Sequence, residues 1–71
     1  MKTNIRKITE GNEESFFEIC HAGMVFNYSQ AFFPKDVKKI AEKHGVVVEY
    51  CEPGTPEYKE HGCHTMKVIS I

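Results

Sequence analysis

Three cysteines and four histidines are the residues of this 71-residue chain whose types and spacing could carry chemistry. Thiolate sulfur and imidazole nitrogen are the ordinary ligands of structural zinc, and a thiol beside an imidazole is the arrangement of a cysteine nucleophile. Six of these residues fall into three groups: Cys20-His21, Cys51 and His61-Gly62-Cys63-His64. The sequence therefore raises two chemical hypotheses, zinc binding and thiol catalysis.

The zinc hypothesis depends on two strands pairing near the C-terminus. If residues 46–51 pair with residues 64–71, Cys51 and Cys63 lie at opposite roots of a hairpin, with His61 and His64 close by. Tetrahedral zinc ligands could then converge. However, there is no Cys-x-x-Cys pair and His-x-Cys-His is not an established zinc spacing. A zinc-stabilised domain with Cys51, His61, Cys63 and His64 as ligands is thus the alternative reading, and zinc is the only cofactor the sequence suggests.

The cysteine nucleophile has less support. His61 lies two residues before Cys63, on the same face of an extended segment, and could act as its base. No orienting acid, oxyanion-hole signature or glycine-rich phosphate loop accompanies the pair, and a substrate pocket would compete with the core of so short a chain. We therefore expect no enzymatic activity. An odd number of cysteines also argues against a disulfide framework.

A basic helix face is a further candidate for binding. Residues 34–44 place apolar side chains at spacings of three and four, with Pro34 suited to the first helical turn and Gly45 to the cap after the last. Four lysines occupy the opposite face: Lys35, Lys38, Lys39 and Lys43. They could contact nucleic-acid phosphates, but a net charge of −1 and a single arginine make this a weaker alternative than a solvated helix surface.

Two aromatic residues stand directly before this helix. Phe32 and Phe33 precede a proline, and in an extended segment they cannot both point inward. One of them either packs as a hydrophobic staple at the helix start or anchors a partner. Together with the lysines they form the predicted partner-binding surface.

The elements that must position these residues are clearest in the second half of the chain. The helix over 34–44 leads into a strand over 46–51, rich in β-branched residues, and residues 64–71 alternate as its partner strand. Residues 52–62 form a connection long enough to be functional.

The N-terminal third admits two interpretations. We favour three strands, over 5–9, 15–20 and 24–28, because Phe, Val and Tyr are dense there. The alternative is a helix over 13–22 capped by Asn12. The favoured interpretation makes residues 1–71 a single small α+β domain: an antiparallel sheet in βββαββ order, with one amphipathic helix packed on one face.

The amino-acid composition excludes several structural and functional classes. Hydrophobic residues make up 41% and charged residues 27% of the chain, which excludes disorder, and the absence of leucine argues against a helical bundle. There is no N-terminal apolar run and no membrane-length segment, so we expect a cytoplasmic protein that does not contact membranes. We predict a non-enzymatic module that binds another protein, as an adaptor or stoichiometric inhibitor. Self-association would also suit so small a core.

Overall fold

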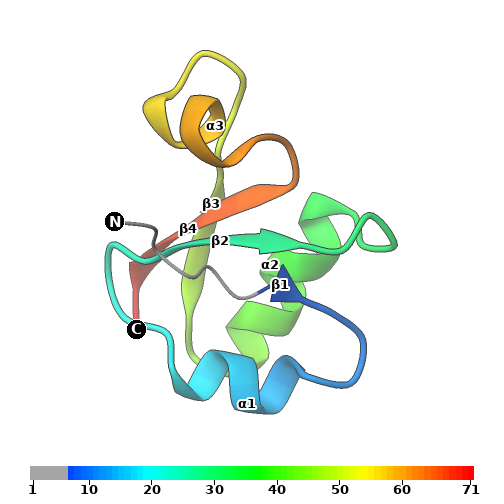
Figure 1. Cartoon of the computed structure of the whole chain (residues 1–71). Helices are drawn as coiled ribbons and strands as arrows, with labels where there is room; N and C mark the ends of the chain where they lie inside the picture. The colour runs from blue at the N-terminus through cyan, green and yellow to red at the C-terminus, as the bar shows by residue number, and fades with distance from the viewer. Residues whose placement is uncertain (1–6) are drawn as a thin grey trace.

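The computed structural model describes residues 7–71, which form a four-stranded sheet and three short helices (Figure 1). This is a small α+β fold, as predicted. In chain order its elements are β1 (Lys7–Ile8), α1 (Glu13–Glu18), β2 (Val25–Tyr28), α2 (Pro34–Lys43), β3 (Val47–Tyr50), α3 (Pro56–His61) and β4 (Thr65–Ser70).

The strands are arranged in the order β1-β2-β4-β3. β1 runs parallel to β2, whereas β4 lies between β2 and β3 and is antiparallel to both. The predicted pairing of the last two strands is confirmed, with Val48 opposite Val68 and Glu49 opposite Lys67. The sheet is therefore mostly antiparallel, with one parallel pair that the sequence interpretation did not anticipate.

The predicted βββαββ order is wrong, because residues 15–20 do not form a strand. Residues 13–18 are helix α1, closer to the alternative that began after Asn12. In a strand, Phe16 and Phe17 would point to opposite faces, and only one could be buried. In the helix they lie about 100° apart, and both are buried, with 1% and 5% of their surfaces exposed.

The prediction of a single helix is also wrong, because the long connection contains α3. The signals for it are local: Thr55 accepts a hydrogen bond from the Tyr58 N–H, Pro56 occupies the first turn, and Glu57 follows. Of the predicted strand over 5–9, Lys7 and Ile8 are a strand, while residues 5 and 6 lie outside the described part.

The predicted helix over 34–44 is confirmed almost to the residue as α2. Pro34 begins it, the carboxylate of Asp36 accepts a hydrogen bond from the Phe33 N–H, and Gly45 follows it with φ 75°. That backbone angle is readily adopted only by glycine, so Gly45 ends the helix and starts the turn into β3.

Alternation along the strands separates the two faces of the sheet. Phe26 and Met66, opposite each other on β2 and β4, are fully buried in the core with residues of α1 and α2. Asn27 and Lys67 point to the other face, where they contact α3 through His61 and Glu57. Thus α1 and α2 cover one face, and α3 covers one end of the other. Figure 1 shows α1 and α3 at opposite ends of the molecule.

Within residues 7–71 no helix is long and apolar enough to cross a membrane.

Candidate functional site

The predicted partner-binding surface lies at the start and along the outer face of α2. Phe32 packs partly buried against the core, whereas Phe33 is 66% exposed. The expectation that the two rings do not both point inward is confirmed. Phe33 precedes the first turn of α2 in extended conformation, and most of its ring is exposed, whereas Val37 and Ala41 of the same helix are buried.

The four lysines of α2 are all exposed. The ion pairs found within residues 7–71 join His61 to Glu60 and Lys67 to Glu57, so none involves an α2 lysine. Asp36, the acidic residue in the first turn, is turned toward the Phe33 N–H at 3.3 Å. An exposed aromatic ring therefore stands at the start of a helix whose exposed lysines form no ion pair within the described chain.

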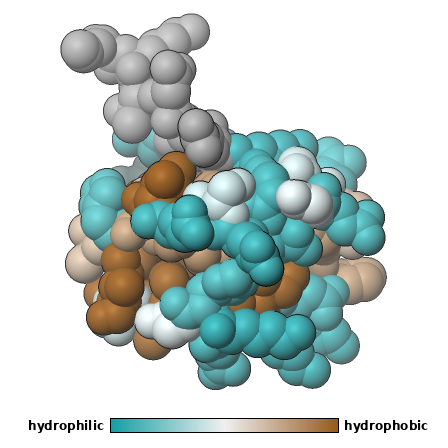
Figure 2. Space-filling view, turned by 90° about the horizontal axis from the view of Figure 1, so that it is seen from below, coloured by the Kyte–Doolittle hydropathy of each residue, from teal (hydrophilic) through white to brown (hydrophobic). Residues whose placement is uncertain are grey.

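Other exposed apolar side chains lie elsewhere. Val47, Ile69 and Ile71 are about half to two-thirds exposed, and they lie where β3 begins and β4 ends, since Val47 pairs with Ser70. Figure 2, which views the molecule from the side of α1, shows apolar surface gathered to one side among hydrophilic residues.

A separate hollow of about 400 Å³ lies at the ends of β1 and β2. The loop that joins α3 to β4 closes one side of it. Seven described residues line it, and among them there is a thiol, two imidazoles and an ammonium group, but no carboxylate: Lys7, Asn27, Tyr28, Gln30, His61, Cys63 and His64.

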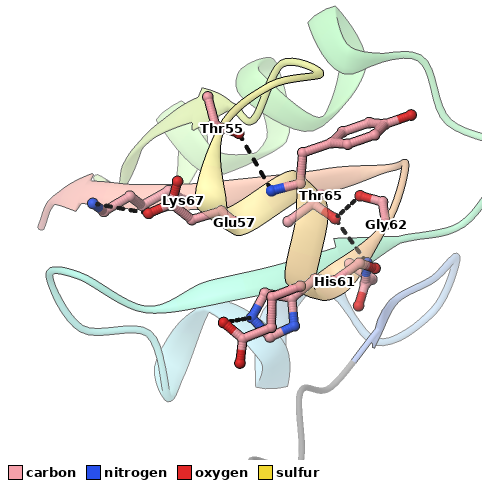
Figure 3. Close-up of polar contacts among 9 residues, drawn as sticks. Thr55, Glu57, His61, Gly62, Thr65 and Lys67 are labelled. Atoms are coloured by element: carbon pink, nitrogen blue, oxygen red, sulfur yellow. Dashed lines mark hydrogen bonds and ion pairs between the residues drawn. The ribbon is translucent and has the colours of Figure 1, made fainter.

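Polar contacts fix the loop beside this hollow. The side-chain amide of Asn27 donates to the backbone oxygens of His61 and His64 at 3.3 and 3.5 Å, and to Thr65 Oγ1 at 2.9 Å. The Thr65 hydroxyl, fully buried, donates to the Gly62 carbonyl at 2.7 Å (Figure 3). We call Asn27 and Thr65 the polar brace, because together they donate hydrogen bonds to the backbone oxygens of His61, Gly62 and His64.

The braced backbone has an unusual shape. Gly62 has φ 84° and ψ −163°, a region open essentially to glycine, and His64 has φ 59°, in the left-handed region that few other residues adopt. The His64 ring meets the Tyr28 ring edge to face, with centroids 5.3 Å apart. This conformation leaves Cys63 exposed at the turn between them.

The three cysteines are free and lie in different surroundings. Cys20 and Cys51 are buried, and loss of water raises the pKa of both thiols. For Cys51, the carboxylate of Glu57 adds to this increase. Cys63 alone is exposed.

The four residues of the alternative zinc hypothesis differ in their solvent exposure. Cys51 is buried at the end of β3, whereas His61 and His64 are partly buried and Cys63 is exposed. Across residues 7–71, no three His, Cys, Asp or Glu side chains come together as a group that could hold a metal ion.

Tyr28 connects the hollow with the core. Its side chain is 1% exposed, and burial raises its pKa to about 12, with smaller contributions from Tyr50, Cys63 and Cys51. The phenol therefore stays protonated at neutral pH and remains a hydrogen-bond donor.

The sequence interpretation found the histidines and the cysteine of this hollow but missed its other lining residues. Strand alternation indicates that Asn27 faces away from Phe26 and the core. Nothing local indicates that it meets His61, 34 residues further along the chain. Lys7 is brought there by its parallel pairing with Asn27, and Tyr28 and Gln30 follow Asn27 along the chain.

No family model, no curated protein and no solved structure matches this chain. The function of the site is therefore inferred from its geometry.

Proposed function

We propose that this chain is a small non-enzymatic module that binds an acidic surface of another protein through Phe33 and the lysines of α2. The observation that carries the proposal is an exposed Phe33 ring at the start of a helix whose exposed lysines form no ion pair in the described chain. Aromatic side chains are frequent anchors at protein interfaces, and complementary charge steers association. The partner that fits has an apolar pocket for the ring, rimmed by carboxylates.

The residues of this surface have separate roles in the proposal. Phe33 fills the partner's pocket, and Lys35, Lys38, Lys39 and Lys43 face its carboxylates, while the half-buried Phe32 holds the start of α2 against the core. Because α2 packs through Val37 and Ala41, its outer face is presented on a rigid support. The proposal places the module in the cytoplasm, as an adaptor or as a stoichiometric inhibitor.

The chain offers a matched control for the test, because Phe33 and Ile71 are equally exposed, at 66% each, on different parts of the surface. Wild-type, Phe33→Ser, Ile71→Ser and Lys35→Glu/Lys39→Glu chains are used as baits in cells that produce the protein. Captured proteins are quantified by mass spectrometry, and the affinity of each candidate is then measured by titration. We expect the true partner to bind the Ile71→Ser chain like wild type.

Removing an interface anchor should weaken binding by about 30-fold or more, and charge reversal should do so in a salt-dependent way. A partner that binds all four chains equally would refute the proposed surface. A partner lost only by Ile71→Ser would transfer binding to the apolar area at the ends of β3 and β4.

A further inference from the structure

The exposed side of α1 is acidic, and the proposed partner-binding surface does not use it. Glu14 and Glu18 are exposed and lie four residues apart, so they share one side of the helix. The other side carries the buried Phe16 and Phe17. The ion pairs found within residues 7–71 involve neither of the two carboxylates. Ile19, which follows the helix directly, is 46% exposed. This side of α1 therefore offers carboxylates and an apolar side chain to a second molecule.

The outer face of α2 is its counterpart in charge and in order. Lys35 and Lys39 are exposed, lie four residues apart and form no ion pair in the described chain. Four residues of helix rise about 6 Å, so the lysine pair and the glutamate pair have the same spacing along their helices. The exposed Phe33 stands two residues before Lys35, as Ile19 stands one residue after Glu18.

The two faces match when α1 runs antiparallel to α2. Placing Glu18 against Lys35 then sets the other carboxylate against the other ammonium group. The same arrangement brings Ile19 to the end of the contact where Phe33 stands. In a parallel arrangement the charges also pair, but the two apolar side chains lie at opposite ends. Charge and apolar surface therefore both favour the antiparallel contact.

Within one chain the two helices do not meet in this way. The ring of Phe17 in α1 stacks on that of His44, the residue after α2, with centroids 5.2 Å apart (Figure 1). α1 thus lies beside the end of α2, whereas Phe33 precedes its start, about 15 Å away along the helix. The antiparallel contact therefore needs a second chain. Because α1 and α2 cover the same face of the sheet, a two-fold axis lets α1 of each copy meet α2 of the other.

We propose that, in the absence of its partner, the α2 surface is occupied by α1 of a second copy in a two-fold dimer, so that self-association and partner binding compete. This inference rests on the proposed function, because it assigns the regulation of that same surface. The whole chain has a net charge of −1, so two copies repel each other little. Solvent-exposed ion pairs each contribute little to affinity. The dimer is therefore weak, and it forms as the protein concentration rises.

The experiment measures self-association of the full chain by sedimentation equilibrium, over a series of concentrations at low and at high salt. Lys35→Glu/Lys39→Glu makes the outer face of α2 acidic, and Glu14→Lys/Glu18→Lys makes that of α1 basic. The matched control is Lys7→Glu/Lys59→Glu, because it changes the net charge as much as the first variant does, at exposed lysines outside both helices. Circular dichroism verifies that each chain is folded.

We expect the wild-type chain to dimerise, and more weakly at high salt. Each reversed chain should have a dissociation constant raised about tenfold or more, because the change acts at both contacts of the dimer. The control should dimerise like wild type. Glu14→Gln/Glu18→Gln, which keeps the side-chain shape, should weaken the dimer in the same direction as the reversal to lysine.

Mixing the two reversed chains is the sharpest part of the test. One of them has two acidic helix faces and the other has two basic ones, so both contacts of a mixed dimer again pair opposite charges. We expect the mixture to form a dimer that neither chain forms alone. A mixture that stays monomeric would overturn the proposal, as would a wild-type chain that is monomeric at millimolar concentration in low salt. Loss of the dimer in the control would also overturn it.

The Glu14→Lys/Glu18→Lys chain separates this proposal from the proposed function. It retains Phe33 and the lysines of α2, so it should capture the partner as well as the wild-type chain does. If it loses the partner, α1 belongs to the partner interface and the competition is refuted. If no captured protein depends on Phe33, the proposed function fails, whereas the sedimentation results for the dimer are unaffected.

Discussion

The two faces of the sheet are held by different forces. On the face covered by α1 and α2, Phe16 and Phe17 pack edge to face with Phe26, and the buried residues form one apolar cluster. On the other face α3 contains no buried residue and is attached through hydrogen bonds and one ion pair. Buried phenylalanines contribute several kcal/mol each, whereas a hydrogen bond contributes about 1 kcal/mol net.

Because of this difference, the partner-binding surface on α2 and the hollow beside Cys63 lie in regions of unequal local stability. The partner-binding surface of Phe33 and the four lysines lies on α2, whose inner side belongs to the apolar cluster. The hollow is closed by the loop after α3, which depends on the polar brace. Segments with few buried apolar contacts open at lower free energy than the core. We therefore expect the loop between α3 and β4 to open locally while the partner-binding surface on α2 stays folded.

The largest predicted effect comes from the apolar face. Phe26→Ala removes a fully buried ring whose centroid lies 4.8 Å from that of Phe16. We expect a loss of about 3–5 kcal/mol in the free energy of unfolding, measured by urea denaturation followed by circular dichroism. This is a large part of the stability of a chain of this size. A loss below 1 kcal/mol would contradict the assignment of the core to this face.

Substitution in the polar brace should lower the free energy of unfolding by an intermediate amount and loosen one loop rather than the core. Asn27→Ala removes the amide that donates to the backbone oxygens of His61 and His64 and to Thr65 Oγ1. We expect a loss of about 1–3 kcal/mol, with faster hydrogen exchange confined to residues 61–65. Asn27→Asp, which keeps the shape but not the donors, should be at least as damaging. Faster exchange across α2 as well would show that the two faces are not independent.

The smallest effect is expected at the ion pair between α3 and β4. Lys67 Nζ lies 3.8 Å from Glu57 Oε2, with both side chains partly exposed (Figure 3). Lys67→Met keeps most of the side-chain bulk, and we expect it to cost less than about 1 kcal/mol. That small loss should shrink further in 1 M salt, as measured by thermal unfolding. A larger, salt-independent loss would mean that Lys67 acts through packing rather than charge.

Local signals were sufficient for α2 and for the pairing of β3 with β4. The apolar stripe, Pro34 and Gly45 define the helix within a dozen residues, and alternation around Val48 and Val68 defines the strands. These features follow from short-range sterics and periodicity, which a sequence carries by itself. A similar local signal, Thr55 before Pro56, precedes α3, whereas the sequence analysis predicts a connection without a helix over residues 52–62.

Tertiary structure alone decided the state of residues 13–18 and the composition of the hollow. The dense aromatic sequence there suits a strand, yet burying both Phe16 and Phe17 against Phe26 requires a helix. Likewise Asn27 and Thr65, 38 residues apart, become a brace only when β2 lies beside β4. The sequence by itself determined which residues are apolar, reactive or charged and where its clearest helix begins and ends. Which of these residues come into contact is decided by the tertiary structure, because side chains far apart in the sequence bury one another only in the folded chain.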